Sequence, residues 1–270
     1  MRKIGGFSSG IILKDLSKSF SEVYINRLTY RILGKISNAT CQLITAILEL
    51  KLLKMYHTFL HAAAIDVDDK AVLIIAPPST GKTFTALSPY KFYNVRFLGD
   101  DMIIVNSDAN CLAFPSNITL HSSSIALLNI TLPANIRASM YVRHFLAEIP
   151  FVARIINKIR IPIDLLVNNK DNLGSSKIDR IYFLDYGEDK CIEINKEIAF
   201  RKVYAAGRMH RGVSENQILL EYAYKYPDIE LDNMIRRQIE IYSRLIDHAE
   251  CYLLLSKKFY HYPKLLARHL

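Results

Sequence analysis

An uninterrupted apolar run leads into a segment rich in proline, glycine and hydroxyl side chains at residues 71–83, AVLIIAPPSTGKT. The apolar run at 71–76 is typical of a strand that is buried on both faces. The residues after it fit the pattern G-x-x-x-x-G-K-[ST], except that Ala76 stands at the first position. In this pattern successive backbone N–H groups surround a phosphate, the lysine reaches its outer oxygens, and the hydroxyl binds magnesium. The sequence therefore predicts a strand, a phosphate-binding loop and a helix from Lys82 whose positive end faces the phosphate.

Most of this loop is predicted to contact a nucleotide, and Thr83 is also a predicted magnesium ligand. The predicted contact residues are Pro78, Ser79, Thr80, Gly81, Lys82, Thr83 and Phe84. Two features depart from the usual pattern. Ala76 would be strained if its position required a positive φ, and Pro77 and Pro78 remove two N–H donors from the loop.

A pair of aspartates follows the loop closely in the sequence. Asp100 and Asp101 lie between two predicted strands, at 95–98 and 102–105, 17 residues after Thr83. Phosphoryl transfer needs one carboxylate for the metal ion and often a second that accepts the proton of the attacking hydroxyl. The alternative is an ordinary Gly-Asp turn. The proximity to the loop favours the functional interpretation.

His61 is a third candidate, since it lies before the apolar strand. A single histidine beside an apolar segment is more often a hydrogen-bonded core side chain than a catalytic one. A helix predicted from Thr40 to Phe59 would, if it continued, place His57 and His61 four residues apart as a metal-binding pair. No further ligand follows at a suitable spacing, so zinc is not expected.

The composition is that of a folded globular protein, with 270 residues, 50% hydrophobic and 23% charged. The net charge of +9 comes without a long basic run, which favours solvated helix faces over a nucleic-acid-binding tail. Four cysteines without a CxxC pair are expected to be free thiols. No apolar stretch is long enough for a membrane span, so we expect a soluble, cytoplasmic protein without a membrane partner.

Further along the chain the pattern predicts helices and strands in alternation. We expect a helix within 140–160, a polar loop at 161–178, a strand at 181–184, a helix at 229–246, a strand at 251–255, and a basic C-terminal helix. A glycine-bounded basic loop is expected at 207–212. No linker or repeat interrupts the chain, which predicts one domain over 1–270. Within it we distinguish an N-terminal segment (1–57), a nucleotide-binding core (58–215) and a C-terminal segment (216–270).

Four of these features together resemble the HPr kinase/phosphorylase family. They are the histidine before a strand at 61–65, the strand at 71–76, the loop at 76–83, and FLGDDMIIV at 97–105. The similarity is greater still to the smaller HPr-kinase-like proteins, some of which lie in peptide-biosynthesis gene clusters. The predicted helix before His61 and the Phe-Pro pair at 114–115 are also similar. The resemblance covers residues 41–120 well.

The resemblance implies an α/β P-loop domain with a mixed sheet and flanking helices, akin to the nucleotide domain of phosphoenolpyruvate carboxykinase. It implies an ATP- and Mg-dependent kinase that phosphorylates a serine hydroxyl of a peptide, a protein or a small molecule. Lys82 and the loop amides would bind the β- and γ-phosphates, and Thr83 with one aspartate would hold magnesium. By the family pattern Asp101 is the general base and Asp100 the metal ligand, although the sequence does not decide between them. His61 would lie near the transferred phosphate.

The C-terminal third resembles the family less closely. Ala206-Gly207-Arg208 is weakly similar to a Pro-Gly-Arg segment of the family, which makes Arg208 a candidate contact for substrate or phosphate. The segment with which full HPr kinases engage HPr has no counterpart, so HPr is not the predicted substrate. The loop at 168–176 is instead a place to look for acceptor contacts.

Two other functions stay open at this point. A non-catalytic nucleotide-binding module is favoured by Ala76 and the paired prolines, and opposed by the intact Lys82, Thr83 and both aspartates. A nucleic-acid-associated P-loop ATPase is suggested by the charge. It would need a basic stripe with interleaved aromatic residues, and the one such cluster in the sequence, at 257–262, fits a surface strand-to-helix turn equally well. The expected partners are therefore a nucleotide and a hydroxyl-bearing acceptor, nucleic acid is not expected, and a homo-oligomer is left open.

Overall fold

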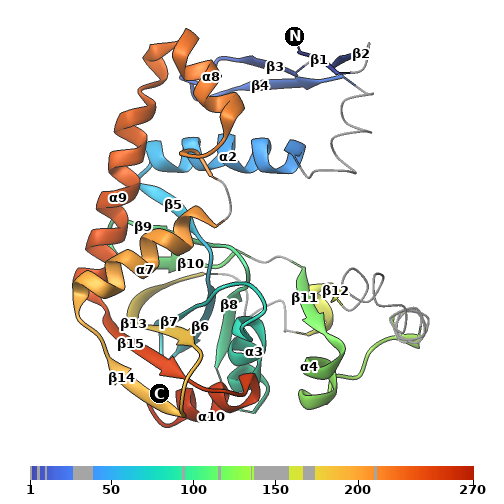
Figure 1. The fold of residues 1–270 in the computed structure, drawn as a ribbon, viewed down its shortest axis with the longest axis vertical. Helices are drawn as coiled ribbons and strands as arrows, with labels where there is room; N and C mark the ends of the chain where they lie inside the picture. Colours follow the sequence, from blue (N-terminus) through green and yellow to red (C-terminus); the bar gives the residue numbers. More distant parts are fainter. Residues whose placement is uncertain are drawn as a thin grey trace.

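The computed structural model describes residues 2–4, 7–9, 11–26, 39–92, 95–114, 117–134, 136, 158–166, 174–209 and 212–270. These residues form a mixed α/β structure in which helices flank a central nine-stranded sheet (Figure 1). The expected fold class, an α/β core with a mixed sheet, is thus confirmed at this level. Of the helices in the described ranges, none combines the length and the apolar character that crossing a bilayer requires.

The sheet has the order β5-β9-β10-β13-β7-β6-β8, with β15 beside β13 and β14 beside β15. Among the paired strands of the described residues, β13–β7 and β13–β15 are parallel and the other pairs are antiparallel. The strand bounds are β5 His57–Leu60, β6 Ala63–Val67, β7 Lys70–Ile75, β8 Arg96–Gly99, β9 Ile103–Asn106, β10 Asn110–Leu112, β13 Ser175–Asp185, β14 Lys190–Glu193 and β15 Glu250–Leu255.

The strand that precedes the predicted loop, β7, lies near the centre of this sheet. Its side chains alternate between two cores: Leu73 and Ile75 belong to one, and Val72 and Ile74 belong to the other. The prediction of a strand buried on both faces is therefore confirmed. The tight turn into β7 places Asp68 and Asp69 at φ values of 52° and 62°, as the favoured two-residue hairpin turns require.

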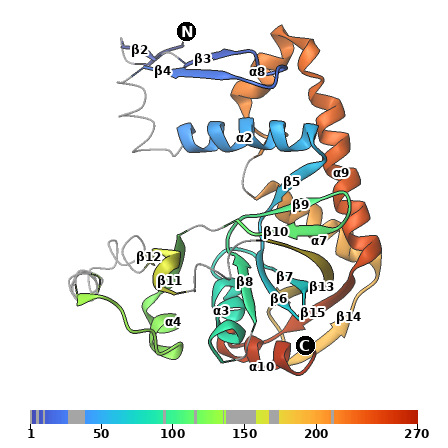
Figure 2. The same ribbon diagram turned by 180° about the vertical axis from the view of Figure 1, so that it is seen from behind.

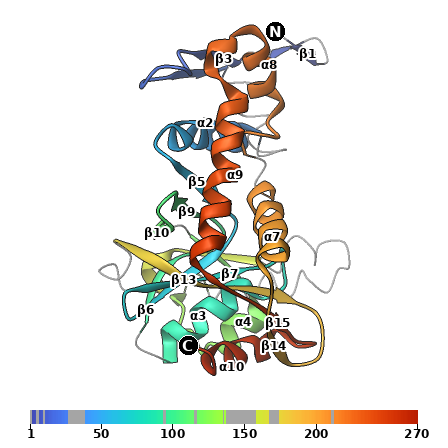
Figure 3. The same cartoon turned by 90° about the vertical axis from the view of Figure 1, so that its left-hand side faces the viewer.

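The helices cover the two faces of the sheet. Helices α2, α7 and α9 contribute to the first core, while α3, α4 and α10 contribute to the second. In all three views α3 and α10 lie together at the end of the molecule that carries the C-terminus (Figures 1–3). The helix bounds are α2 Ala39–Lys54, α3 Lys82–Phe92, α4 Ser122–Leu127, α7 Lys196–Arg208, α8 Gln217–Lys225, α9 Leu231–His248 and α10 Tyr262–Ala267, with 3-10 turns η1 Ile163–Leu165, η3 Pro227–Ile229 and η4 Phe259–His261.

In the described residues, two small hairpins and one further antiparallel strand pair lie outside the main sheet. The pairs β1–β2 (Arg2–Ile4 and Phe7–Ser9) and β3–β4 (Ile11–Lys14 and Glu22–Ile25) lie beyond α2, at the end of the molecule opposite α10 (Figure 3). The pair β11–β12 (Ile118–His121 and Lys158–Ile161) lies at the side of α3 together with α4 (Figure 2).

The predicted helix at 40–59 is too long. Helix α2 ends at Lys54, Tyr56 has a φ of 57°, and His57–Leu60 forms strand β5, which pairs with β9. The apolar spacing that suggests a continued helix at Tyr56 is overridden by this strand pairing. His57 and His61 are consequently not a helical pair.

Other elements differ from the expectation in length. Gly207 and Arg208 form the last turn of α7 and not a loop. The strand expected at 181–184 extends over 175–185, and therefore includes part of the segment expected to be a loop. The helix expected within 140–160 falls largely outside the described residues, but its last part, 158–160, is in strand β12. Helix α9 and strand β15 confirm the predictions at 229–246 and 251–255.

Candidate active site

The loop between β7 and α3 turns at two positions that follow Ala76 in the sequence. Positive φ values occur at Ser79 (68°) and Gly81 (107°), whereas Ala76 has none. The strain expected at Ala76 is therefore absent, because this backbone does not need a glycine there. Thr80 N–H donates to the Pro77 carbonyl at 3.4 Å, and Gly81 O accepts from Thr85 N–H at 2.9 Å as α3 begins.

Lys82, the first residue of α3, points into a polar cluster. Its Nζ lies 3.2 Å from Asp101 Oδ1 and 3.1 Å from His61 Nε2. The lysine side chain is 6% exposed, while that of Asp101 is 56% exposed. His61 reaches the cluster from the junction of β5 and β6, and Asp101 reaches it from the turn between β8 and β9. Three segments that are separate in the sequence thus place one cation, one carboxylate and one imidazole in contact.

The β8–β9 turn is tight and closely packed. Met102 N–H donates to the Asp100 carbonyl at 2.7 Å, and Asp101 has a φ of 63°. A Cβ at Gly99 would lie 3.2 Å from the Phe114 carbonyl oxygen, so a larger residue would displace this strand end. The turn directs Asp101 towards Lys82 and Asp100 towards Thr83.

Asp100 is buried at 1% exposure and accepts a hydrogen bond from Thr83 Oγ1 at 2.8 Å on its Oδ2. Burial raises the pKa of Asp100 to about 6, because it disfavours the ionised carboxylate. The positive charge of Lys82 opposes this rise, and the negative charge of Asp101 adds to it. At neutral pH a carboxyl group with this pKa is mostly ionised, so Asp100 offers a buried negative charge to a cation beside it.

A carboxylate next to a hydroxyl is a donor set that suits magnesium, which usually binds through one or two carboxylates together with phosphate oxygens and water. Asp100 and Thr83 supply such a pair. Across the part of the chain that the structure describes, no group of three His, Cys, Asp or Glu side chains could hold a metal ion. The pair therefore fits a magnesium ion that depends on substrate phosphates for its remaining ligands.

A cavity of about 630 Å³ opens over the loop. This volume lies within the range of about 300–1,000 Å³ that is common for small-molecule sites. Its lining residues come from the loop and the start of α3, from the β5–β6 junction, from the β8–β9 turn, from β11 and α4, and from η4. They are His61, Pro77, Pro78, Ser79, Gly81, Lys82, Thr83, Phe84, Asp101, Thr119, Leu120, Ser124 and Phe259.

Strand β5, which ends just before His61, is fixed by a buried polar cluster. The Glu49 carboxylate, on α2, accepts from Thr58 Oγ1, from Gln238 Nε2 and from Val213 N–H, each at 2.9 Å. Tyr242 OH donates to the Phe59 carbonyl at 2.8 Å. These bonds join α2, α9 and the segment after α7 to the strand, and so determine where His61 lies.

Sequence reasoning missed several of these residues. Glu49 could have been noticed in the sequence, since it is a charged residue at helical spacing among the apolar residues of α2. Phe259 belongs to the aromatic-basic cluster at 257–262, which the sequence connects only with nucleic-acid binding, and Thr119 and Ser124 gave no sequence signal, because only the tertiary fold brings them to the cavity. The predicted contact Arg208 lies elsewhere: it is exposed, pairs with Glu215 at 2.7 Å, and is not among the lining residues.

The chain matches no known protein-family model and no curated protein sequence. Among solved structures it is similar to the Hpr(Ser) kinase/phosphatase from Coxiella burnetii, with a TM-score of 0.30 and 13% sequence identity. The match covers 51% of this chain and 77% of that one. The likeness is distant.

Proposed function

We propose that this chain is a kinase that transfers the γ-phosphate of ATP, with magnesium, to a serine hydroxyl of a peptide, a protein or a small molecule. The observation that supports it most is the contact of Lys82 with both His61 and Asp101 in the cavity over the loop. Phosphoryl transfer depends on positioning and on charge stabilisation, and these are the groups that provide both.

The loop and its lysine have the role of binding the donor. Apart from Thr80 N–H, which donates to the Pro77 carbonyl, the N–H groups from Ser79 to Thr83 and the start of α3 bind the phosphates, and Lys82 compensates the charge of the outer oxygens. Thr83 and Asp100 hold the metal ion, which neutralises charge that develops on the phosphate oxygens. Because Lys82 is nearly buried, its charge acts with little screening by water.

Asp101 has the role of general base. Its exposed carboxylate can be reached by an acceptor hydroxyl in the cavity. The acceptor oxygen forms a bond to the γ-phosphorus, the bond from that phosphorus to the β–γ bridging oxygen breaks, and ADP leaves. The hydroxyl proton goes to Asp101. His61 and Asp101 both contact Lys82 Nζ, and the contact with His61 keeps the lysine between Asp101 and the phosphate.

A non-catalytic nucleotide-binding module is the second candidate. The feature that favours it is the pair Pro77 and Pro78, which line the cavity and have no N–H groups to offer a phosphate. Such a module would bind ATP and leave it intact.

The test is to incubate the protein with Mg²⁺ and γ-labelled ATP in the presence of serine, serine-containing peptides and an extract of the source organism. The matched control is Lys82→Ala. Label that moves to an acceptor with the wild type alone supports the kinase. Tight ATP binding without transfer to any acceptor and without phosphate release would contradict it and support the binding module.

A further inference from the structure

The cavity has an aromatic wall that comes from the C-terminal segment of the chain. Phe259, in η4, packs directly on the phosphate loop: a Cβ at Gly81 would lie only 2.9 Å from Phe259 Cβ. The Phe259 ring also contacts Phe84, with centroids 5.2 Å apart and planes at 78°. Both rings line the cavity. Phe259 therefore contacts Gly81 of the loop, 178 residues earlier in the sequence.

A network of hydrogen bonds holds this segment in place. Asp189 accepts from Ser256 Oγ at 2.7 Å on one oxygen, and His261 Nδ1 lies 2.6 Å from the other. Tyr262 OH donates to the Asp185 carbonyl at 2.7 Å. Ser256 and Tyr262, which flank Phe259, are both buried. The aromatic wall is consequently fixed before any ligand binds.

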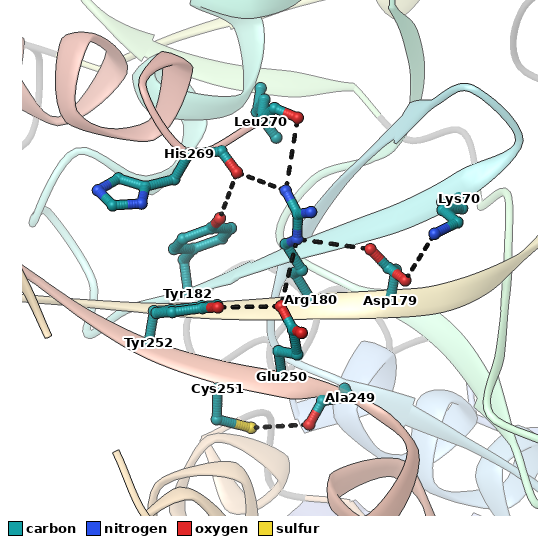
Figure 4. Close-up of polar contacts among 10 residues, drawn as sticks. All are labelled: Lys70, Asp179, Arg180, Tyr182, Ala249, Glu250, Cys251, Tyr252, His269 and Leu270. Atoms are coloured by element: carbon teal, nitrogen blue, oxygen red, sulfur yellow. Dashed lines mark hydrogen bonds and ion pairs between the residues drawn. The ribbon is translucent and has the colours of Figure 1, made fainter. Parts of the chain in front are cut away.

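The end of the segment is anchored a second time, on the main sheet (Figure 4). Arg180 of β13 donates to the carbonyl oxygens of His269 and Leu270, and Tyr182 OH donates to that of His269 at 3.3 Å. Arg180 is itself held by Asp179 and Glu250 at 3.5 and 3.6 Å. Residues 256–270 are thus fastened on both sides of η4.

Aromatic side chains do not stabilise a bound phosphate chain, but they do stabilise a bound nucleobase. Bases stack on aromatic side chains whatever their sequence identity, because each base has a π-face. In this cavity the charged groups are at Lys82 and Asp101, and the aromatic and apolar ones are Phe84, Phe259 and the prolines. An inorganic polyphosphate would fill the first part only.

We infer that Phe259 contacts the base of the bound donor, and that the donor is a nucleoside triphosphate and not an inorganic polyphosphate. This inference rests on the proposed phosphate-binding role of the loop. It makes η4, which lies outside the sequence motif, part of the nucleotide site. It also explains why the segment is fastened so firmly.

The test compares the binding of Mg·ATP and of magnesium with inorganic triphosphate by titration calorimetry. Phe259→Leu keeps an apolar side chain against Gly81 but removes the ring, and is expected to weaken ATP binding by about tenfold or more. Its affinity for triphosphate should stay within about twofold of the wild type. Phe259→Tyr should restore ATP binding, which separates stacking from misfolding.

Two further variants serve as controls. Tyr224→Ala removes an exposed ring on α8 that does not line the cavity, and should leave both affinities unchanged. Lys82→Ala should weaken both ligands together. An equal loss of ATP and triphosphate in Phe259→Leu, or no loss of either, would overturn the inference. A wild type that binds triphosphate as tightly as ATP would also overturn the inference, but it would not contradict the proposed kinase. A wild type that binds neither ligand would overturn both proposals.

Discussion

Asp100 is the buried carboxyl group of the site, and its ionisation links the site to the stability of the protein. Burial raises its pKa to about 6, above the usual 3.8. A folded-state pKa that lies above the unfolded one favours the protonated form in the folded protein. The cost of ionising Asp100 is therefore absent below about pH 4 and fully present above about pH 6, so this group lowers stability as the pH rises through that window.

Asp100→Asn is predicted to stabilise the protein more at pH 8 than at pH 4.5, because asparagine has no charge to bury. The measurement is the difference in Tm between variant and wild type, without nucleotide, at the two pH values. We expect a gain of a few degrees at pH 8 over the difference at pH 4.5. The exposed Asp108 offers a matched control, Asp108→Asn. Equal differences at both pH values would contradict the role of burial.

At this scale the sequence predicted the residues that are close to the loop in the chain. Lys82 and Thr83 follow from a motif, and the contact of Thr83 with Asp100 agrees with the expected pairing of a hydroxyl and a carboxylate. Ala76 shows the limit of motif reasoning, since the backbone φ decides whether a glycine is needed and the sequence does not state φ. The sequence drew attention to the cluster at 257–262 but could not place Phe259 at the loop, because its contact with Gly81 exists only after the whole chain has folded.

Among the elements, the crossing of α7 and α9 depends on one glycine. A Cβ at Gly207 would lie 2.2 Å from the hydroxyl of Tyr242 and 2.6 Å from its ring. Tyr242 has little room to move, because it is buried and its hydroxyl donates to the Phe59 carbonyl. The helix therefore includes Gly207, where the sequence suggested a loop, because the close approach of α9 requires it.

Gly207→Ala is predicted to destabilise the protein by about 1–3 kcal/mol through overpacking. This reverses the usual effect of alanine in a helix interior, which is stabilising by roughly 0.5–1 kcal/mol. The measurement is chemical unfolding of the variant and the wild type. A stabilised Gly207→Ala variant would show that α9 does not approach α7 this closely.

Contacts with distant parts of the chain also explain why helix α2 is shorter than the sequence predicts. Apolar spacing continues past Lys54 to Tyr56, which predicts a longer helix, but residues 57–60 pair with β9 and Thr58 bonds to the buried Glu49. Sequence periodicity reports local preference, whereas strand pairing is a contact between distant segments. The elements that were predicted well, α3, α9, β7 and β15, are those whose local pattern and tertiary environment agree.

On the scale of the whole molecule, the C-terminal segment contributes to the centre of the sheet. Strand β15 lies parallel to β13, which in turn lies parallel to β7, and α10 packs in the same core as α3. Paired residues of β13 and β7 are 107–108 positions apart and those of β13 and β15 are 70 apart, and local patterns in a single sequence do not specify such pairing. We propose that the segments 1–57, 58–215 and 216–270 form one domain.

One domain predicts one cooperative thermal transition. Circular dichroism and tyrosine fluorescence should give the same Tm, and the calorimetric enthalpy should equal the van't Hoff enthalpy. Tyrosines are present both beyond α2 and around α10, so the fluorescence samples both ends of the molecule. Two separated transitions would show that the N-terminal hairpins or the C-terminal segment unfold independently.

The proposed phosphoryl transfer is tested most directly by following the γ-phosphate of ATP with Asp101→Asn beside the wild type. Asparagine keeps the shape of the side chain but cannot accept the hydroxyl proton. We expect transfer to an acceptor to fall by about 10²–10⁴-fold, with ATP binding retained. Transfer by Asp101→Asn at the wild-type rate would contradict the proposed base. A wild type that binds ATP and transfers phosphate to nothing would contradict the kinase itself.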